Sequence, residues 1–331
     1  MKNNWRGIWP VLAAALLVLS GCGGTDGADV PTEEKRLQIV TTVFPPFDFA
    51  KQVGGEYVEV KMLLKPGMES HSYEPTPADI VTIMNSDIFL YAGGESDVWV
   101  EELLEGSDRA PESHALLEWV EPLEEETADG MQVKGHGHGH GHGEDAHEAV
   151  KLEESEYDEH VWTSPKNAMV IVDRICRLLS EKDPAHKTEF EENAAAYTDK
   201  LKELDDAFLH VVEQARRKTL VFGDRFPLLY FVKTYGLSYY AAFPGCSMET
   251  EPSAETIAFL TDQVRKEQIP IVFYLEMSNG KVAEAIAEAT GAETAVFYSG
   301  HSITARDLAA GEDYLSLMGR NVESLQRALS E

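Results

Sequence analysis

A run of alternating glycine and histidine in the middle of the chain has the clearest chemistry. It extends from Gly135 to Gly143, and Glu144, Asp145 and His147 follow closely. Imidazole is the commonest protein ligand for zinc, nickel and copper, and glycine leaves the backbone free to wrap around an ion. We interpret the run as a metal-capturing loop rather than a solvated linker or a relic of cloning. Its histidines are His136, His138, His140, His142 and His147.

Residues that can bind a metal also follow several hydrophobic runs that we predict to be strands. In open parallel sheets ligands bind beyond the carboxyl ends of the strands, so side chains at these positions can meet at one site. The residues concerned are His71, His160, Asp224, Glu276 and His301. Each has an ordinary alternative, because a histidine in a loop is more often structural and a carboxylate after a strand usually caps a helix. Asp224, for instance, precedes a helix that we expect near Pro227.

Short runs of β-branched and aromatic residues alternate with stretches of helical period. The predicted strands are Leu37–Thr42, Val58–Leu64, Ile88–Tyr91, a weak one near Trp119–Val120, Thr219–Phe222, Ser238–Ala241, Ile271–Leu275 and Ala295–Tyr298. The clearest predicted helices are Pro77–Met84, Ser253–Lys266 and Lys281–Thr290. This alternation predicts an α/β fold of two lobes, each with a parallel sheet flanked by helices. Because both halves of the chain supply candidate ligands, we expect the metal site in the cleft between the lobes.

A long helix is predicted to join the two lobes. Apolar residues recur every three or four positions from Phe190 to Ala215, and Pro184 suits the first turn of a helix. No further Gly or Pro occurs before Arg217, so one helix of roughly 30 residues would be about 45 Å long. Such a rod limits how far the lobes can hinge. The predicted organisation is a lipoprotein signal peptide at 1–21, a tether at 22–36, an N-terminal lobe at 37–183 with a His-rich loop at 129–155, the linking helix at 184–217 and a C-terminal lobe at 218–331.

The N-terminal residues have the pattern of a secretory signal. Lys2 and Arg6 precede an apolar stretch from Ile8 to Val18, which is shorter than the roughly 20 residues that a membrane span needs. The sequence Leu-Ser-Gly that follows ends at Cys22 and resembles a bacterial lipobox, which implies cleavage before Cys22 and lipid on its thiol. We therefore expect an extracytoplasmic protein anchored by lipid to the bacterial cell membrane.

Charge and cysteine content narrow the possible partners. The formal net charge of −30 excludes general nucleic-acid binding, which needs a basic surface. In an oxidising compartment Cys176 and Cys246 could pair, but Cys176 lies in a helical pattern, so a buried free thiol is an equal alternative.

Two longer motifs surround the histidines of the first half. Pro66–Pro77 contains His71, and Asp158–Trp162, followed by Ser164-Pro165, contains His160. They resemble the first and second ligand motifs of the zinc- and manganese-binding proteins of ABC importers, the ZnuA-like group of cluster A-I. Further matches, in the family's order, are Tyr230-Phe231, Tyr235–Leu237, Glu251–Ser253, Phe273–Glu276 and Ala287–Ala292. The family's fold, two α/β lobes with a long linking helix, agrees with the patterns above.

The resemblance implies a set of ligands. His71 and His160 match the two first-lobe ligands, while the family's third ligand, usually His, falls at Arg225. A guanidinium stays protonated and cannot bind a metal. The fourth ligand, often Asp, falls near the end of the last strand, where we interpret His301 as the ligand. We expect Glu276 to be the next ligand, or to pair with Arg225, and Asp224 comes after it.

Three imidazoles and one carboxylate or water suit Zn²⁺, whereas Mn²⁺ prefers more oxygen ligands. The resemblance therefore implies a receptor, not an enzyme, that binds zinc and delivers it to the permease and ATPase of an ABC importer, and we expect a monomer. A manganese receptor of the same class is one alternative. A secreted zinc metallohydrolase with Glu276 as general base is another, although no His-Glu-x-x-His or Gly-x-Ser-x-Gly motif supports it. A purely structural surface protein would leave the strand-end histidines unexplained.

Overall fold

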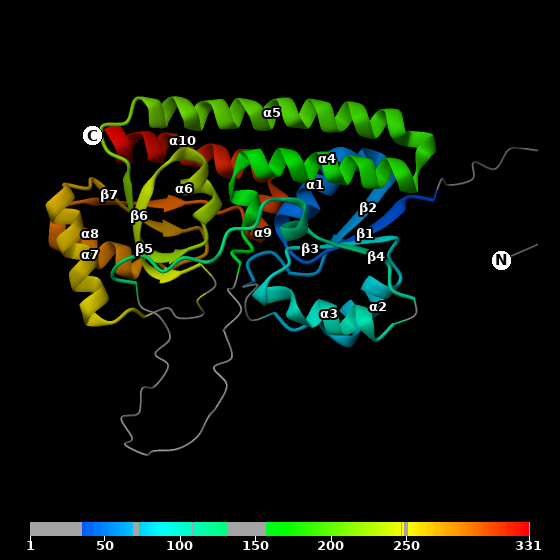
Figure 1. Ribbon diagram of the computed structural model, residues 1–331, viewed down its shortest axis with the longest axis horizontal. Helices are drawn as coiled ribbons and strands as arrows, with labels where there is room; N and C mark the ends of the chain where they lie inside the picture. The colour runs from blue at the N-terminus through cyan, green and yellow to red at the C-terminus, as the bar shows by residue number, and fades with distance from the viewer. Residues whose placement is uncertain are drawn as a thin grey trace, which may run out of the picture. The chain divides into compact units, whose positions relative to one another are not determined.

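The computed structural model describes residues 35–68, 73–107, 109–131, 157–245, 247 and 251–330. From Arg36 onwards the chain forms one compact unit (Figure 1). Cys22, His71, Cys246 and the His-rich run, with His136, His138, His140, His142 and His147, lie outside the described residues. No helix among the residues described is long and apolar enough to cross a membrane. Cys176 is a free thiol, buried in its helix.

The first half of the chain forms a sheet of four parallel strands. These are β1 (Leu37–Thr41), β2 (Val58–Met62), β3 (Ile88–Tyr91) and β4 (Glu112–Ala115), in the order β2-β1-β3-β4. Three of them stand where the sequence predicted. The weak strand predicted near Trp119–Val120 is wrong, because Leu116–Trp119 is a 3₁₀ turn. The true fourth strand has a largely polar sequence and pairs only with β3, so it lacks the alternation that reveals a strand.

The second half forms another sheet of four parallel strands with the corresponding order. Its strands are β5 (Thr219–Phe226), β6 (Ser238–Pro244), β7 (Ile271–Leu275) and β8 (Glu293–Phe297), in the order β6-β5-β7-β8. Strand β5 continues past the predicted end at Phe222, and its register shifts between Phe222 and Arg225. Gly223 lies in this irregular stretch, where a Cβ would meet the backbone nitrogen of Ala283 at 2.5 Å. Only glycine allows this close approach.

Helices cover both faces of each sheet. In the first half α1 (Phe44–Gly54), α4 (Pro165–Lys182) and α5 (Lys187–Glu213) pack on one face, and α2 (Pro77–Met84) and α3 (Val98–Glu105) pack on the other (Figure 1). Neighbouring residues of β1 show the pleat, since Ile39 belongs to one core and Val40 to the other. In the second half α7 (Ala254–Glu267) and α8 (Lys281–Thr290) cover one face, and α6 (Leu229–Tyr235) and α10 (Tyr314–Ser330) cover the other. The short α9 (Ala305–Ala309) precedes α10.

Helix α5 connects the two halves and packs against both. It has 27 residues and follows a 3₁₀ turn at Pro184–His186, which corresponds to a rod of about 40 Å. It contacts α1 and α4 of the first half and α6 and α10 of the second, and one hydrophobic core extends through all of them. The predicted fold class, two α/β lobes joined by one long helix, is confirmed. The exact domain boundaries stay predictions.

Candidate metal centre

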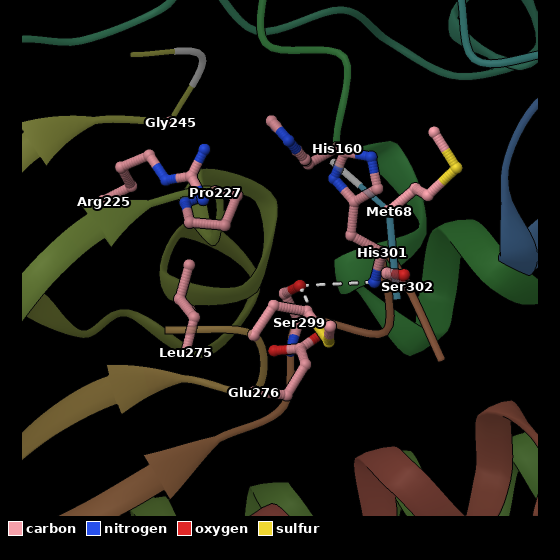
Figure 2. Close-up of a pocket in the computed structure, with 11 residues that line it drawn as sticks. Met68, His160, Arg225, Pro227, Gly245, Leu275, Glu276, Ser299, His301 and Ser302 are labelled. Atoms are coloured by element: carbon pink, nitrogen blue, oxygen red, sulfur yellow. Dashed lines mark hydrogen bonds between the residues drawn. The ribbon is translucent and has the colours of Figure 1, made fainter. Parts of the chain in front are cut away.

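A cavity of about 40 Å³ lies where loops of both lobes meet the carboxyl ends of the second sheet. The first lobe contributes Met68, from the loop after β2, and His160. The second lobe contributes Arg225, Glu276 and His301, among others (Figure 2). Since parallel strands end at one edge of their sheet, residues far apart in the sequence converge here.

His301 reaches the cavity through a tight turn after β8. Gly300 has a φ of 67°, a left-handed conformation that glycine adopts without strain. Its neighbour Ser299 accepts a hydrogen bond from the His301 backbone N–H through its hydroxyl, at 3.2 Å. The Ser299 N–H and hydroxyl in turn each donate to one oxygen of Glu276, at 2.9 Å. The turn that carries His301 is thus fixed to the end of β7.

His160 is completely buried and is oriented by Asp158. One oxygen of Asp158 accepts both the backbone N–H of His160, at 2.7 Å, and its ring Nδ1, at 3.0 Å. With the proton on Nδ1, Nε2 has its lone pair available for an ion, the arrangement of carboxylate–histidine pairs in metal sites. Burial lowers the pKa of His160, but the carboxylates of Asp158, Glu159 and Glu125 together outweigh burial and raise it above its usual range.

The two imidazoles lie at a distance suited to one shared ion. Their ring centroids are 5.0 Å apart, with an angle of 59° between the ring planes. Two imidazoles bound to one tetrahedral zinc at the usual Zn–N distance have centroids about 5 Å apart. The indole of Trp162 packs edge-on against both rings, at 5.7 Å from His160 and 5.3 Å from His301. The rings are therefore held in place by packing on one side and are open to the cavity on the other.

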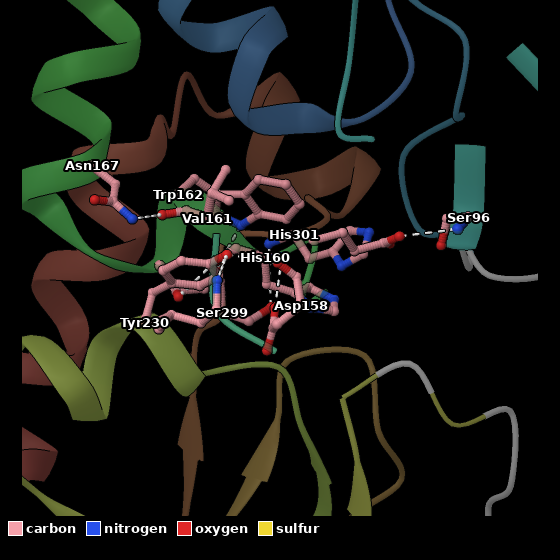
Figure 3. A network of polar contacts seen from close by, with 12 residues as sticks. Ser96, Asp158, His160, Val161, Trp162, Asn167, Tyr230, Ser299 and His301 are labelled. Carbon is pink, nitrogen blue, oxygen red and sulfur yellow. Dashed lines mark hydrogen bonds and ion pairs between the residues drawn. The ribbon is translucent and has the colours of Figure 1, made fainter. Parts of the chain in front are cut away.

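The residues around His160, which we call the His160 segment (158–164), are hydrogen-bonded to the second lobe (Figure 3). These bonds run from the hydroxyl of Tyr230 to the carbonyl of Asp158 at 2.9 Å, from the indole of Trp162 to the carbonyl of Ser299 at 3.2 Å, from the hydroxyl of Tyr314 to the carbonyl of Trp162 at 2.6 Å, and between the hydroxyls of Thr234 and Ser164 at 2.8 Å. Although it belongs to the first half of the sequence, the His160 segment is thus fixed to the lobe that carries His301.

Of the two predicted carboxylates, Glu276 lines the cavity together with Arg225, whereas Asp224 does not. Glu276 lines the cavity, and burial raises the pKa of its carboxyl group. Its partner is Ser299, so the expected ion pair with Arg225 is wrong within the part of the chain described here. Arg225 instead donates from Nη1 to the carbonyl of Ser247, at 3.4 Å.

Asp224 does not line the cavity. Its carboxylate accepts the backbone N–H groups of Arg225, at 2.8 Å, and of Leu275, at 3.1 Å, so it braces β5 against β7. Its alternative interpretation as a helix cap near Pro227 is also wrong, because α6 begins at Leu229 with Leu228 as N-cap.

Sequence reasoning missed several residues of this site. Asp158 and Ser299 hold two of the candidate ligands in place, and Met68 and Met277 line the cavity from opposite lobes. The signal for Asp158 was present, since it stands two residues before His160 in the same motif. Among the described residues no group of three or more His, Cys, Asp or Glu side chains could hold a metal ion. Of the candidate histidine ligands in the cavity, His160 and His301 are the ones that the structure describes.

A comparison with protein families gives one match that covers most of the chain. The family described as the periplasmic component A of the zinc-uptake complex, ZnuA, matches residues 39–328. The chain belongs to this family. The ZnuA-like resemblance inferred from the motifs is confirmed.

Several relatives of the ZnuA family are similar over nearly the whole chain. The zinc-binding lipoprotein AdcA of Streptococcus pneumoniae strain R6 is 33% identical over 95% of this chain, which spans 59% of the length of AdcA. The high-affinity zinc uptake system protein ZnuA of Bacillus subtilis is 29% identical, and the match covers 99% of both chains. Among solved structures, the Zn(II)-bound ZnuA-like domain of S. pneumoniae AdcA matches with a TM-score of 0.72 and 31% identity, over 90% of this chain and all of that domain.

Proposed function

We propose that the chain is an extracytoplasmic receptor that binds zinc in the cavity between its lobes and delivers it to an ABC permease for uptake. The observation that carries this proposal is the pair of imidazoles at 5.0 Å, one of them oriented by a buried carboxylate. The names of AdcA and ZnuA as zinc-binding and zinc-uptake proteins support the choice of metal. Capture and release of an ion need no covalent chemistry, so the proposed role is binding and not catalysis.

The proposed ligands are His71, His160 and His301, and Glu276, which lines the same cavity, becomes the oxygen ligand only after a local rearrangement, because it forms no metal-binding group with His160 and His301 as they lie. Each oxygen of Glu276 accepts one hydrogen bond from Ser299 and keeps a further lone pair for a metal. Asp224 braces β5 against β7 and does not line the cavity, so it is not among the proposed ligands. Three imidazoles and one carboxylate form a nitrogen-rich site, which favours zinc over manganese.

The remaining parts of the proposal rest on the sequence. Cys22 carries the lipid that anchors the chain outside the cytoplasmic membrane, as the name of the lipoprotein AdcA also suggests. The His-rich loop at 129–155 is an auxiliary element that collects ions for the cavity. The partners are the permease and the ATPase of a metal importer, and the receptor acts as a monomer.

Calorimetric titration of the chain with zinc and with manganese tests this function. We expect tight zinc binding, with an affinity at least about tenfold lower in His160→Ala and in His301→Ala. His210→Ala is the matched control, because His210 is exposed on α5 and lies outside the cavity. Undiminished zinc affinity in both cavity variants would contradict the assignment of the site, and tighter binding of manganese would contradict the choice of metal.

A further inference from the structure

Tyr314, the first residue of α10, lies next to both segments that carry the imidazoles of the cavity. Its side chain is completely buried. Burial raises the pKa of its hydroxyl above the ordinary value, so the hydroxyl stays protonated and acts as a hydrogen-bond donor. The hydroxyl, the ring and the backbone N–H each contact a different part of the molecule. These contacts give Tyr314 a place in the geometry of the metal centre.

The hydroxyl of Tyr314 fixes the His160 segment. It donates to the carbonyl of Trp162 at 2.6 Å, two residues after His160. The indole of Trp162 packs edge-on against the rings of both His160 and His301 (Figure 3). The hydroxyl therefore holds the backbone of the residue whose ring sets the position of both imidazoles.

The ring of Tyr314 supports the turn that carries His301. A Cβ built on Gly300 would lie 3.4 Å from the ring carbons Cδ2 and Cε2, so the ring packs directly against the backbone of Gly300. This glycine has its φ at 67° and stands immediately before His301. Tyr314 thus contacts the segments of both imidazoles, with its hydroxyl on one side and its ring on the other.

The first lobe and the linking helix hold Tyr314 itself in place. Its backbone N–H donates to Oδ2 of Asp48 on α1 at 3.1 Å. The same oxygen accepts the hydroxyl of Tyr197 on α5, also at 3.1 Å. The ring of Phe49, the next residue of α1, packs edge-on against the Tyr314 ring with 4.9 Å between centroids. The position of Tyr314 is therefore set by elements outside the cavity.

We propose that Tyr314 is a positioning residue of the metal centre, which holds His160 and His301 at their spacing before an ion binds. The inference rests on the proposed zinc-binding function and assigns Tyr314 no contact with the ion. A four-coordinate zinc needs its nitrogen ligands at about 2.0–2.1 Å in a tetrahedral arrangement. Ligands that are already fixed in this arrangement lose less conformational freedom when the ion binds, so the affinity is higher.

Zinc titration of Tyr314→Phe and of Tyr197→Phe, each paired with urea denaturation of the zinc-free chain, tests the proposal. Both substitutions remove one buried hydroxyl from a hydrogen bond, so both should lower the free energy of unfolding. Tyr197→Phe is the matched control, because its hydroxyl is bonded to Asp48 and not to the His160 segment. Only Tyr314→Phe should also weaken zinc binding, by about fivefold, which is the effect of one ordinary hydrogen bond.

The difference between affinity and stability separates positioning from a merely structural role. The proposal is overturned if Tyr314→Phe binds zinc as tightly as the unaltered chain, or if both variants lose zinc affinity to the same extent. Either result would leave the zinc receptor intact, since the unaltered chain would still bind the ion. Absence of tight zinc binding in the unaltered chain would overturn both proposals.

Hydrogen exchange in the unaltered chain covers the case in which Tyr314→Phe is poorly folded. Because coupling between two sites is reciprocal, an ion held by the positioned imidazoles must also stabilise the contacts of Tyr314. Zinc should therefore slow exchange of the Tyr314 amide, which donates to Asp48, about fivefold more than exchange of the Asp183 amide. Asp183 is the C-cap of α4, at the opposite end of this helix from the His160 segment. An equal effect of zinc on the two amides would overturn the positioning role.

Discussion

The carboxylate of Asp158 should control both the strength and the pH dependence of metal binding. It accepts Nδ1 of His160 at 3.0 Å, and both groups are buried. Asp158→Asn keeps an oxygen that can accept this hydrogen bond but removes the charge. Hydrogen bonds to charged groups contribute about 1 kcal/mol more than neutral ones, so we expect zinc affinity to fall about five- to tenfold at neutral pH. Asp158→Ala also removes the positioning of the ring and should cost about 10- to 100-fold.

Burial and the neighbouring carboxylates shift the pKa of His160 in opposite directions, so the pH dependence of zinc binding distinguishes the two effects. Burial lowers the pKa of His160, whereas the carboxylates of Asp158, Glu159 and Glu125 raise it, and the net shift is upward. A protonated imidazole cannot bind a metal, and zinc affinity in the unaltered chain should therefore begin to fall at a pH above the ordinary histidine value of about 6.5. Asp158→Asn removes the largest of the raising contributions, so the pKa of His160 should fall relative to the unaltered chain. The zinc affinity of the variant should be weaker at high pH but decline less on acidification.

Competition with a chromogenic zinc chelator between about pH 8 and about pH 5.5 measures both effects. Asp173→Asn is a suitable control, because it removes one carboxylate from an exposed ion pair on α4. The reasoning is refuted if Asp158→Asn binds zinc as tightly as the unaltered chain at high pH. It is also refuted if the two affinities run parallel over the whole pH range.

Three further perturbations have expected outcomes. Burial raises the pKa of Asp48 to about 6, whereas the pKa of an aspartate in the unfolded chain is about 4. The free energy of unfolding should therefore fall by roughly 3 kcal/mol as the pH rises from below 4 through 6. Urea denaturation should show a smaller loss in Asp48→Asn. Gly223→Ala should destabilise the chain by about 1–3 kcal/mol, because the added Cβ would lie 2.5 Å from the backbone nitrogen of Ala283. Gly319→Ala is the control, because a Cβ there, in helix α10, would meet nothing within 4 Å. Thermal unfolding should show a loss of stability in the first variant and none in the second. Deleting Gly135–His147 should lower the number of zinc ions bound in calorimetry while the tightest site remains, and loss of that site would contradict its position in the cavity.

The parts of the fold that were predictable are those whose residues are buried on both sides. Strands such as Ile88–Tyr91 and Ile271–Leu275 are short apolar runs between helical patterns, and the structure has them at these bounds. The strand at Glu112–Ala115 could not be found, because an edge strand with polar side chains lacks the apolar pattern. The extension of β5 beyond Phe222 was missed for a different reason. The added residues Arg225 and Phe226 pair with Phe243 and Pro244 of β6, and this pairing is a tertiary contact.

The sequence predicted that His160 and His301 meet at one site, but it did not predict the hydrogen-bond partners of the two carboxylates. His160 and His301 were chosen because metal-binding residues near strand ends meet at one edge of a sheet, and the structure places their rings 5.0 Å apart. The contacts of Asp224 and Glu276 were not predictable. Asp224 binds the end of β7 and Glu276 binds the turn after β8, and these contacts depend on which strands are neighbours. Sequence order alone does not give that order.

The attachment of the His160 segment to the second lobe limits how the proposed cargo can leave. Opening the cavity by separating the lobes at this point would break four hydrogen bonds. At about 1 kcal/mol each, the open state would hold roughly one molecule in a thousand. Helix α5, which packs against both lobes, opposes the same motion. Movement of the loops that carry Met68 and Met277, which line the cavity without belonging to the His160 segment, breaks none of these bonds. We therefore expect release to proceed by loop movement while His160 and His301 keep their relative position.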